Sequence, residues 1–171
     1  MNDGKRRLLT AGITAGGVGA ALAAVLLIGG PWQDSRDRKE TVAERGQSVM
    51  PFDLEQTTHH FTPTVMGGVQ EVVADQSDDA KQIGLIRTHL RQEAKAFSRG
   101  DFGDPAQIHG ENMPGLAELE DGYERIEVRY RERPDGATLT YNTEEPALID
   151  ALHDWFEAQL SDHGDHAEAG H

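Results

Sequence analysis

The residues of this sequence with the clearest chemical potential are its histidines and one methionine. The chain has 171 residues and eight histidines, and all eight follow residue 58. Imidazole and thioether groups together suit copper, whereas imidazole and carboxylate groups also bind zinc or iron. In a domain this small, three or four such side chains can meet around one ion, so the sequence predicts a transition-metal site with copper favoured. The candidate ligands are His59, His89, His109, Met113, His153 and His163.

Two of these candidates lie in a stretch that connects regular elements. Residues 100–116, GDFGDPAQIHGENMPGL, are rich in glycine, proline and aspartate and predict an irregular loop. Loops on a rigid scaffold often carry binding residues, so this one is a candidate for presenting His109 and Met113 to a metal. Methionine also commonly fills gaps in hydrophobic cores, and simple packing of Met113 is the alternative.

Two further candidates have a carboxylate four residues later. The segments HLRQEA (residues 89–94) and HDWFEA (residues 153–158) both read His-x-x-x-Glu-Ala. On a helix this spacing places His89 beside Glu93, and His153 beside Glu157, where such a pair could act as acid and base. Each histidine could equally be half-buried and hydrogen-bonded. The sequence lacks a serine-hydrolase elbow, a phosphate loop, a dinucleotide fingerprint and a His-Glu-x-x-His motif, so it does not predict an enzyme.

The elements that must position these side chains follow one pattern twice. Residues 57–74 predict a β-hairpin, and residues 77–97 predict a helix with Ser77 as its N-cap. Residues 123–141 predict a second hairpin, followed by a second helix that ends at Gly164. We therefore expect an α+β domain over residues 55–163, in which two ββα units form an antiparallel sheet with helices on one face.

The first 30 residues predict a transmembrane helix that precedes this domain. Three basic residues come before residues 8–30, which carry no charge and would reach about 34 Å as a helix, enough to cross a hydrocarbon core of about 30 Å. The basic flank would keep the N-terminus in the cytoplasm and place residues 31–171 on the extracytoplasmic side of a cell membrane crossed once. A secretory signal is the alternative, although no clear cleavage site follows Ile28.

The segments that flank the outer domain are polar. Residues 31–54 have mixed charge and no sustained apolar period, and they predict a juxtamembrane linker. The tail, residues 164–171, alternates histidine with acidic residues. It could bind divalent ions loosely, but a flexible, solvated tail is the expected state.

Composition narrows the classes of partner and cofactor. Thirty Asp and Glu residues outnumber 16 Lys and Arg residues, for a net charge of -14, so the surface repels phosphate backbones and nucleic acid is excluded as a partner. Cysteine is absent, which excludes disulfides, thiolate-bound zinc and covalent haem attachment. A haem held only by two histidines would be a variant of the metal prediction.

Three stretches of the outer domain resemble a family of small bacterial proteins that are sometimes labelled aspartate carbamoyltransferase. The stretches are GDFGDPAQIHGENMPGL, LHDWFEAQLSDHGDH and FTPTVMGGVQEV, and the resemblance covers about residues 51–167. The label itself does not fit this chain, because the Ser-Thr-Arg-Thr phosphate loop and the His-Pro-x-Gln segment of transcarbamoylases are both absent. The resemblance therefore implies a folded module and assigns no site residues.

The sequence thus predicts a membrane-anchored, exported domain that binds a transition metal. The alternative is a non-catalytic module that docks a protein partner at the membrane surface. A metal site requires the histidine rings to converge, because ligands about 2 Å from one ion lie close together. A docking module predicts dispersed histidines and a contiguous exposed apolar patch. A hydrolase or transferase would need a concave pocket with a histidine and a carboxylate at its floor.

Overall fold

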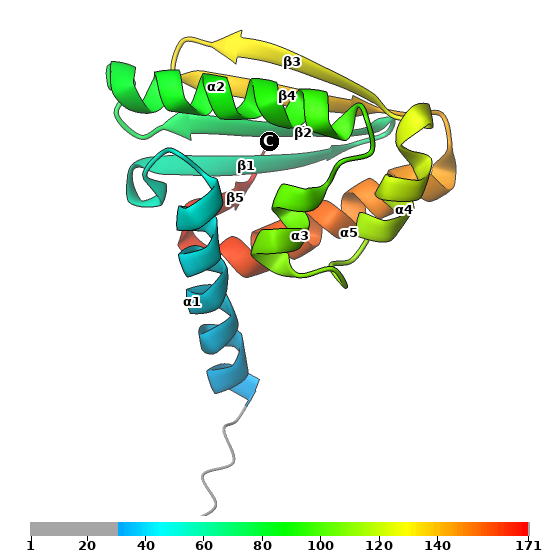
Figure 1. Cartoon of the computed structure of the whole chain (residues 1–171), viewed down its shortest axis with the longest axis horizontal. Coiled ribbons are helices and arrows are strands. Elements are labelled where there is room, and N and C mark those ends of the chain that lie inside the picture. The colour runs from blue at the N-terminus through cyan, green and yellow to red at the C-terminus, as the bar shows by residue number, and fades with distance from the viewer. Residues whose placement is uncertain (1–30, 171) are drawn as a thin grey trace, which may run out of the picture.

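A five-stranded sheet forms one layer of the fold, and helices α2 and α5 pack against one of its faces (Figure 1). The computed structural model describes residues 31–170. The strands are β1 (Thr57–Thr64), β2 (Gly67–Ala74), β3 (Glu127–Arg133), β4 (Gly136–Asn142) and β5 (Ala167–Ala169). The helices are α1 (Pro31–Val49), α2 (Ala80–Phe97), α3 (Gly103–His109), α4 (Leu116–Gly122) and α5 (Pro146–His163). The α+β class expected from the sequence is confirmed.

Both predicted hairpins are present, and they join through their second strands. The order across the sheet is β3-β4-β2-β1-β5, with β2 and β4 antiparallel at the centre. The expectation of a purely antiparallel sheet is wrong, because β5 runs parallel to β1 and makes the sheet mixed. Gly164, with φ of 58°, ends α5 and turns the chain back along β1. The tail that we expected to be flexible therefore contributes a short edge strand.

Helix α2 carries the first His-x-x-x-Glu segment. Its N-cap is Asp79 rather than the predicted Ser77, because the Asp79 carboxylate accepts hydrogen bonds from the backbone N–H groups of Lys81 and Gln82. Helical spacing predicts its buried face, and those side chains all lie in the core: Ile83, Ile86, Leu90, Ala94 and Phe97. The same face presents Glu93, which lies between Leu90 and Phe97 along the helix.

Helix α5 carries the second such segment and most of the aromatic core. Trp155 is only 1% exposed, and its ring packs edge-on against Tyr141 of β4 and Phe97 of α2, with centroids 5.7 and 6.0 Å away. Phe156, on the same helix, packs against Phe61 of β1. Each aromatic pair contributes about 0.5–1.5 kcal/mol beyond the area that it buries. These contacts hold α2 and α5 in fixed positions over the sheet.

The connector between the two units is more regular than we expected. Residues 103–109 form α3, so the prediction of an irregular loop over residues 100–116 is wrong for that part. Pro105 lies in the first turn of α3, where the missing N–H of a proline removes no hydrogen bond. Gly110, with φ of 96°, ends the helix. The first turn of α3 carries Asp104, and its last residue is His109.

Residues 31–54, which we expected to be a linker, contain a helix that packs against the domain. Helix α1 contacts α3 and α5, and it buries Val42. The Arg38 guanidinium binds the Asp162 carboxylate of α5 through Nε and Nη2, at 2.5 and 2.6 Å. Polar and charged residues dominate the sequence of α1. Its hydrophobic pattern therefore did not indicate packing.

The predicted membrane anchor, residues 8–30, lies outside the described residues. Among the helices of residues 31–170, none combines the length and the apolar character needed to cross a bilayer.

Candidate metal centre

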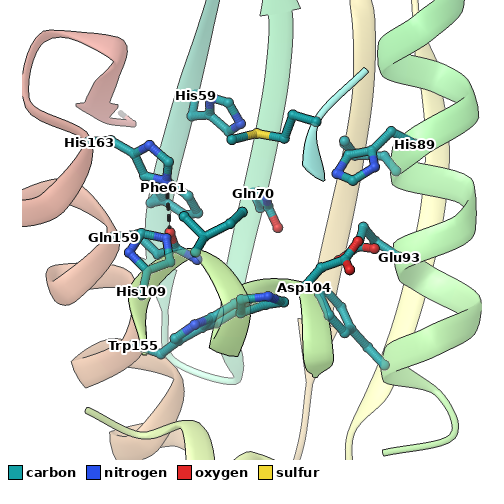
Figure 2. A pocket seen from close by; sticks show the side chains of 15 residues that line it. His59, Phe61, Gln70, His89, Glu93, Asp104, His109, Trp155, Gln159 and His163 are labelled. Carbon is teal, nitrogen blue, oxygen red and sulfur yellow. Dashed lines mark hydrogen bonds between the residues drawn. The ribbon is translucent and has the colours of Figure 1, made fainter. Parts of the chain in front are cut away.

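A cavity of about 40 Å³ lies in the core beside the aromatic cluster (Figure 2). Side chains from β1, β2, α2, α3 and α5 line it. Four of the six predicted metal ligands are among them: His59, His89, His109 and His163. Since roughly 10–15 Å³ accommodates one water molecule, the cavity has room for an ion and one or two small molecules. The fold therefore brings four predicted ligands to one cavity, but the group of ligand atoms close enough to share an ion within residues 31–170 includes a single histidine, His89.

One end of the cavity holds a histidine and two carboxylates. His89 and Glu93 are four residues apart on α2, so both side chains leave the same face of the helix. Asp104 approaches them from the first turn of α3 (Figure 2). One ligand atom from each of the three residues lies within 4.8 Å of the other two. An ion placed between them could be bound by one imidazole nitrogen and two carboxylate oxygens.

The charges at this end favour a cation. Burial, the charge of Asp104 and a hydrogen bond with Asp104 together raise the pKa of Glu93 from 4.5 to about 8, and the charge of Asp101 adds to the shift. Every charged group that acts on Glu93 is thus another carboxylate. Burial lowers the pKa of His89, which keeps its imidazole neutral and able to bind a metal. A bound cation would replace the proton that Glu93 otherwise retains.

The other end of the cavity is built from three imidazoles. The His163 ring stacks on His59 with centroids 5.3 Å apart and meets His109 edge-on at 4.9 Å. Burial lowers the pKa of all three rings, to about 3 for His59. Because burial disfavours the charged form, all three are neutral at physiological pH.

Hydrogen bonds with two side chains of α5 orient two of these rings. Asp162 of α5 lies 2.9 Å from Nδ1 of His109, and Gln159 Oε1 lies 3.1 Å from Nε2 of His163. Burial alone would raise the pKa of Asp162, but hydrogen bonds from Arg38 and His109 lower it. The ionised carboxylate therefore holds the proton of His109 on Nδ1 and leaves Nε2 with its lone pair, as is common for metal-binding histidines.

Two buried polar atoms on the cavity wall have no hydrogen-bond partner within residues 31–170. They are Nδ1 of His59 and Nε1 of Trp155. Trp155 lies across the floor of the cavity, between the imidazole end and the carboxylate end (Figure 2). Buried polar groups are nearly always paired in folded proteins, so both atoms indicate an occupant of the cavity.

Two of the predicted ligands lie elsewhere. Met113 is 4% exposed and belongs to the hydrophobic core, which matches the packing alternative. His153 lies outside the cavity lining, and its Nε2 is 3.0 Å from the backbone oxygens of Thr64 and Gly67. The two His-x-x-x-Glu segments therefore differ in the burial of their glutamates. Glu93 is buried at the site, whereas Glu157 is exposed.

Sequence reasoning missed several residues of the cavity wall. Asp104 was hidden in the stretch that we expected to be irregular, and nothing distinguished it from its acidic neighbours. Met50 also lines the cavity, in place of Met113 as the nearby thioether. Trp155 and Gln159 lie on the buried face of α5, and helical spacing identified neither of them.

No protein-family model matches the chain, and neither a curated protein nor a solved structure shows significant similarity to it. The function is therefore inferred from the geometry of the site.

Proposed function

We propose that this protein binds one divalent transition-metal ion through His89, Glu93 and Asp104. The observation that carries the proposal is the approach of these three ligand atoms to within 4.8 Å of one another on the wall of a buried cavity. Two neighbouring carboxyl groups on a cavity wall are unfavourable when both are ionised, unless a proton or a bound cation compensates their negative charge. The unpaired nitrogens of His59 and Trp155 on the same wall support an occupant independently.

The donor set favours manganese, iron(II) or zinc over copper. One imidazole and two carboxylates form a hard to borderline set, whereas copper(I) prefers thioether and thiolate sulfur. The preference for copper in the sequence analysis depended on Met113, which packs in the core instead. A haem is too large for a cavity of about 40 Å³.

The location of this site relative to a membrane is a separate proposal. It depends on residues 8–30 as an anchor and on the basic residues before them, which would place the metal-binding domain on the extracytoplasmic side.

Elemental analysis of the full-length chain in a non-ionic detergent tests the proposal. The protein is loaded separately with Mn(II), Zn(II) and Cu(I), and then desalted extensively. We expect about one equivalent of Mn(II) or Zn(II) to be retained, because three protein ligands suffice for a stable site. Glu93→Gln combined with Asp104→Asn should abolish retention, since both substitutions keep side-chain size and remove the anionic ligands.

Glu157→Gln is the matched control, because Glu157 occupies the same place in the second His-x-x-x-Glu segment but is exposed. It should retain metal like the unmodified chain. Absence of metal in the folded unmodified protein, or equal retention by the double variant, would show that these residues are not a metal site.

A metal-dependent hydrolase is a second candidate, because the cavity meets the condition of a concave site with a histidine and carboxylates. The docking alternative has less support. Within the described part of the chain, the exposed large apolar residues are Val65 and Met66, at one hairpin turn, and they do not make a broad patch.

A further inference from the structure

The unpaired atoms of His59 and Trp155 indicate what a metal ion in this cavity would bind besides protein. The His59 side chain is on β1 and the Trp155 indole is on α5, and the two residues are 4% and 1% exposed. Both line the same small cavity as His89, Glu93 and Asp104. The two unpaired atoms and the three proposed metal ligands thus belong to the lining of one cavity.

The chemistry of the two atoms restricts the occupant. The indole N–H of Trp155 can only donate a hydrogen bond. Burial lowers the pKa of His59 and keeps its ring neutral, so Nδ1 accepts a hydrogen bond in the tautomer that has its proton on Nε2. With this tautomer, the occupant must accept from Trp155 and donate to His59. A water molecule can do both while one of its lone pairs binds a metal.

We propose that the ion bound by His89, Glu93 and Asp104 keeps an open coordination position, where Trp155 and His59 hold a water molecule or a small anion that replaces it. This inference rests on the proposed metal site. Three protein ligands with one position left for water are typical of catalytic rather than structural metal sites. A divalent ion also lowers the pKa of bound water, so the site is suited to hydrolysis or hydration of a small substrate.

The first test detects the bound water in the unmodified full-length protein. Mn(II)-loaded protein is measured by electron paramagnetic resonance in ordinary water and in water enriched in oxygen-17. Broadening or hyperfine coupling from oxygen-17 is the expected result. A Mn(II) signal with no effect of oxygen-17 would overturn the open position and leave the metal site itself intact.

The second test uses azide as a probe of the same position, in Co(II)-loaded protein followed by absorption. Trp155→Phe keeps the aromatic floor and removes the N–H donor, so azide affinity should fall about tenfold, the value of one hydrogen bond. Azide has no proton to offer an unprotonated Nδ1, so azide affinity should rise in His59→Phe. Trp32→Phe, at the other tryptophan, is the control for Trp155→Phe.

The outcomes separate the two proposals. Loss of all metal binding in the unmodified chain would end both. Normal metal retention, with azide affinity unchanged in Trp155→Phe, would overturn the role of Trp155 alone. A fall in azide affinity in His59→Phe, with its metal content and thermal stability preserved, would overturn His59 as an acceptor. Because the oxygen-17 measurement needs no variant, misfolding of a variant does not prevent a decision.

Discussion

Glu93 on α2 and Asp104 on α3 place their carboxyl oxygens within 4.8 Å of each other, although a helix end and a turn separate them along the chain. The contact depends on α3, because the first turn of that short helix brings Asp104 to the face of α2 that carries His89 and Glu93. Without metal, this carboxyl pair retains a proton. With metal, both groups can be ionised, so metal binding and proton release are coupled.

The metal-free protein should lose stability as the pH rises toward 8, because of Glu93. Its pKa is raised from 4.5 to about 8 by burial and by neighbouring carboxylates. Between these values the folded state binds more protons than the unfolded state, so the free energy of unfolding falls with pH, by up to about 1.4 kcal/mol per unit. Chemical denaturation in a chelator at about pH 6.5 and about pH 8 measures the effect.

Glu93→Gln should remove this dependence, so that the variant becomes more stable relative to the unmodified chain as the pH rises. Glu157→Gln should behave like the unmodified chain. Parallel pH dependences for Glu93→Gln and the unmodified protein would mean that Glu93 is ionised normally in the fold.

Acid should destabilise the protein through the opposite effect at His59. Burial lowers the pKa of this ring from 6.5 to about 3, so the folded state keeps it neutral. Between these values the unfolded state binds more protons, and the free energy of unfolding falls as the pH falls. His59→Phe should weaken that dependence below about pH 6.5 in metal-free protein. His60→Gln on the opposite face of β1 should retain it, and an equal acid response in all three proteins would contradict the prediction.

Gly115 is expected to be essential for packing α4 against α5. It has φ of 76°, and a Cβ atom at this position would lie 2.1 Å from the backbone oxygen of Ala151. Gly115→Ala should therefore lower the free energy of unfolding by about 2–4 kcal/mol through strain and displacement of α5. Gly84→Ala is the matched control, because a Cβ there contacts nothing within 4 Å on an exposed face of α2. It should stabilise the protein by about 0.5–1 kcal/mol. Thermal unfolding that ranks the two variants otherwise would contradict this account.

The parts of the fold with a strong apolar period were predictable. Helices α2 and α5 are 18 residues long, and the spacing within α2 identified its buried apolar face, as well as the shared face of His89 and Glu93. On α5 the spacing identified Leu148, Leu152 and Phe156 but not Trp155. The hairpins were identified by alternation and by their turns. The short or polar elements were not identified: β5 has three residues, and α1 consists mainly of polar and charged residues.

The residues of the candidate site were predictable only in part, because some of them lie on short elements. His59, His89, His109 and His163 were candidates by residue type alone, and the fold brings them to one cavity. Asp104 could not be selected, because its position depends on a seven-residue helix that contains glycine and proline. Met113 and His153 were equally good candidates by residue type. Their places in the core and beside the hairpin backbone depend on long-range packing, which local spacing does not encode.

Arg38 is expected to hold α1 on the domain. Its guanidinium binds both oxygens of Asp162, whose side chain is 5% exposed, while Arg38 itself remains half-exposed. Arg38→Ala leaves a buried carboxylate with only His109 as its partner, so the free energy of unfolding should fall by about 1–3 kcal/mol. Exposed Arg36 is the control, and Arg36→Ala should change stability by less than about 0.5 kcal/mol.

Because Asp162 is at the imidazole end of the cavity, Arg38→Ala should keep Mn(II) bound at the carboxylate end. Limited proteolysis should then release α1 faster from this variant than from Arg36→Ala, and equal rates would mean that apolar contacts alone hold the helix.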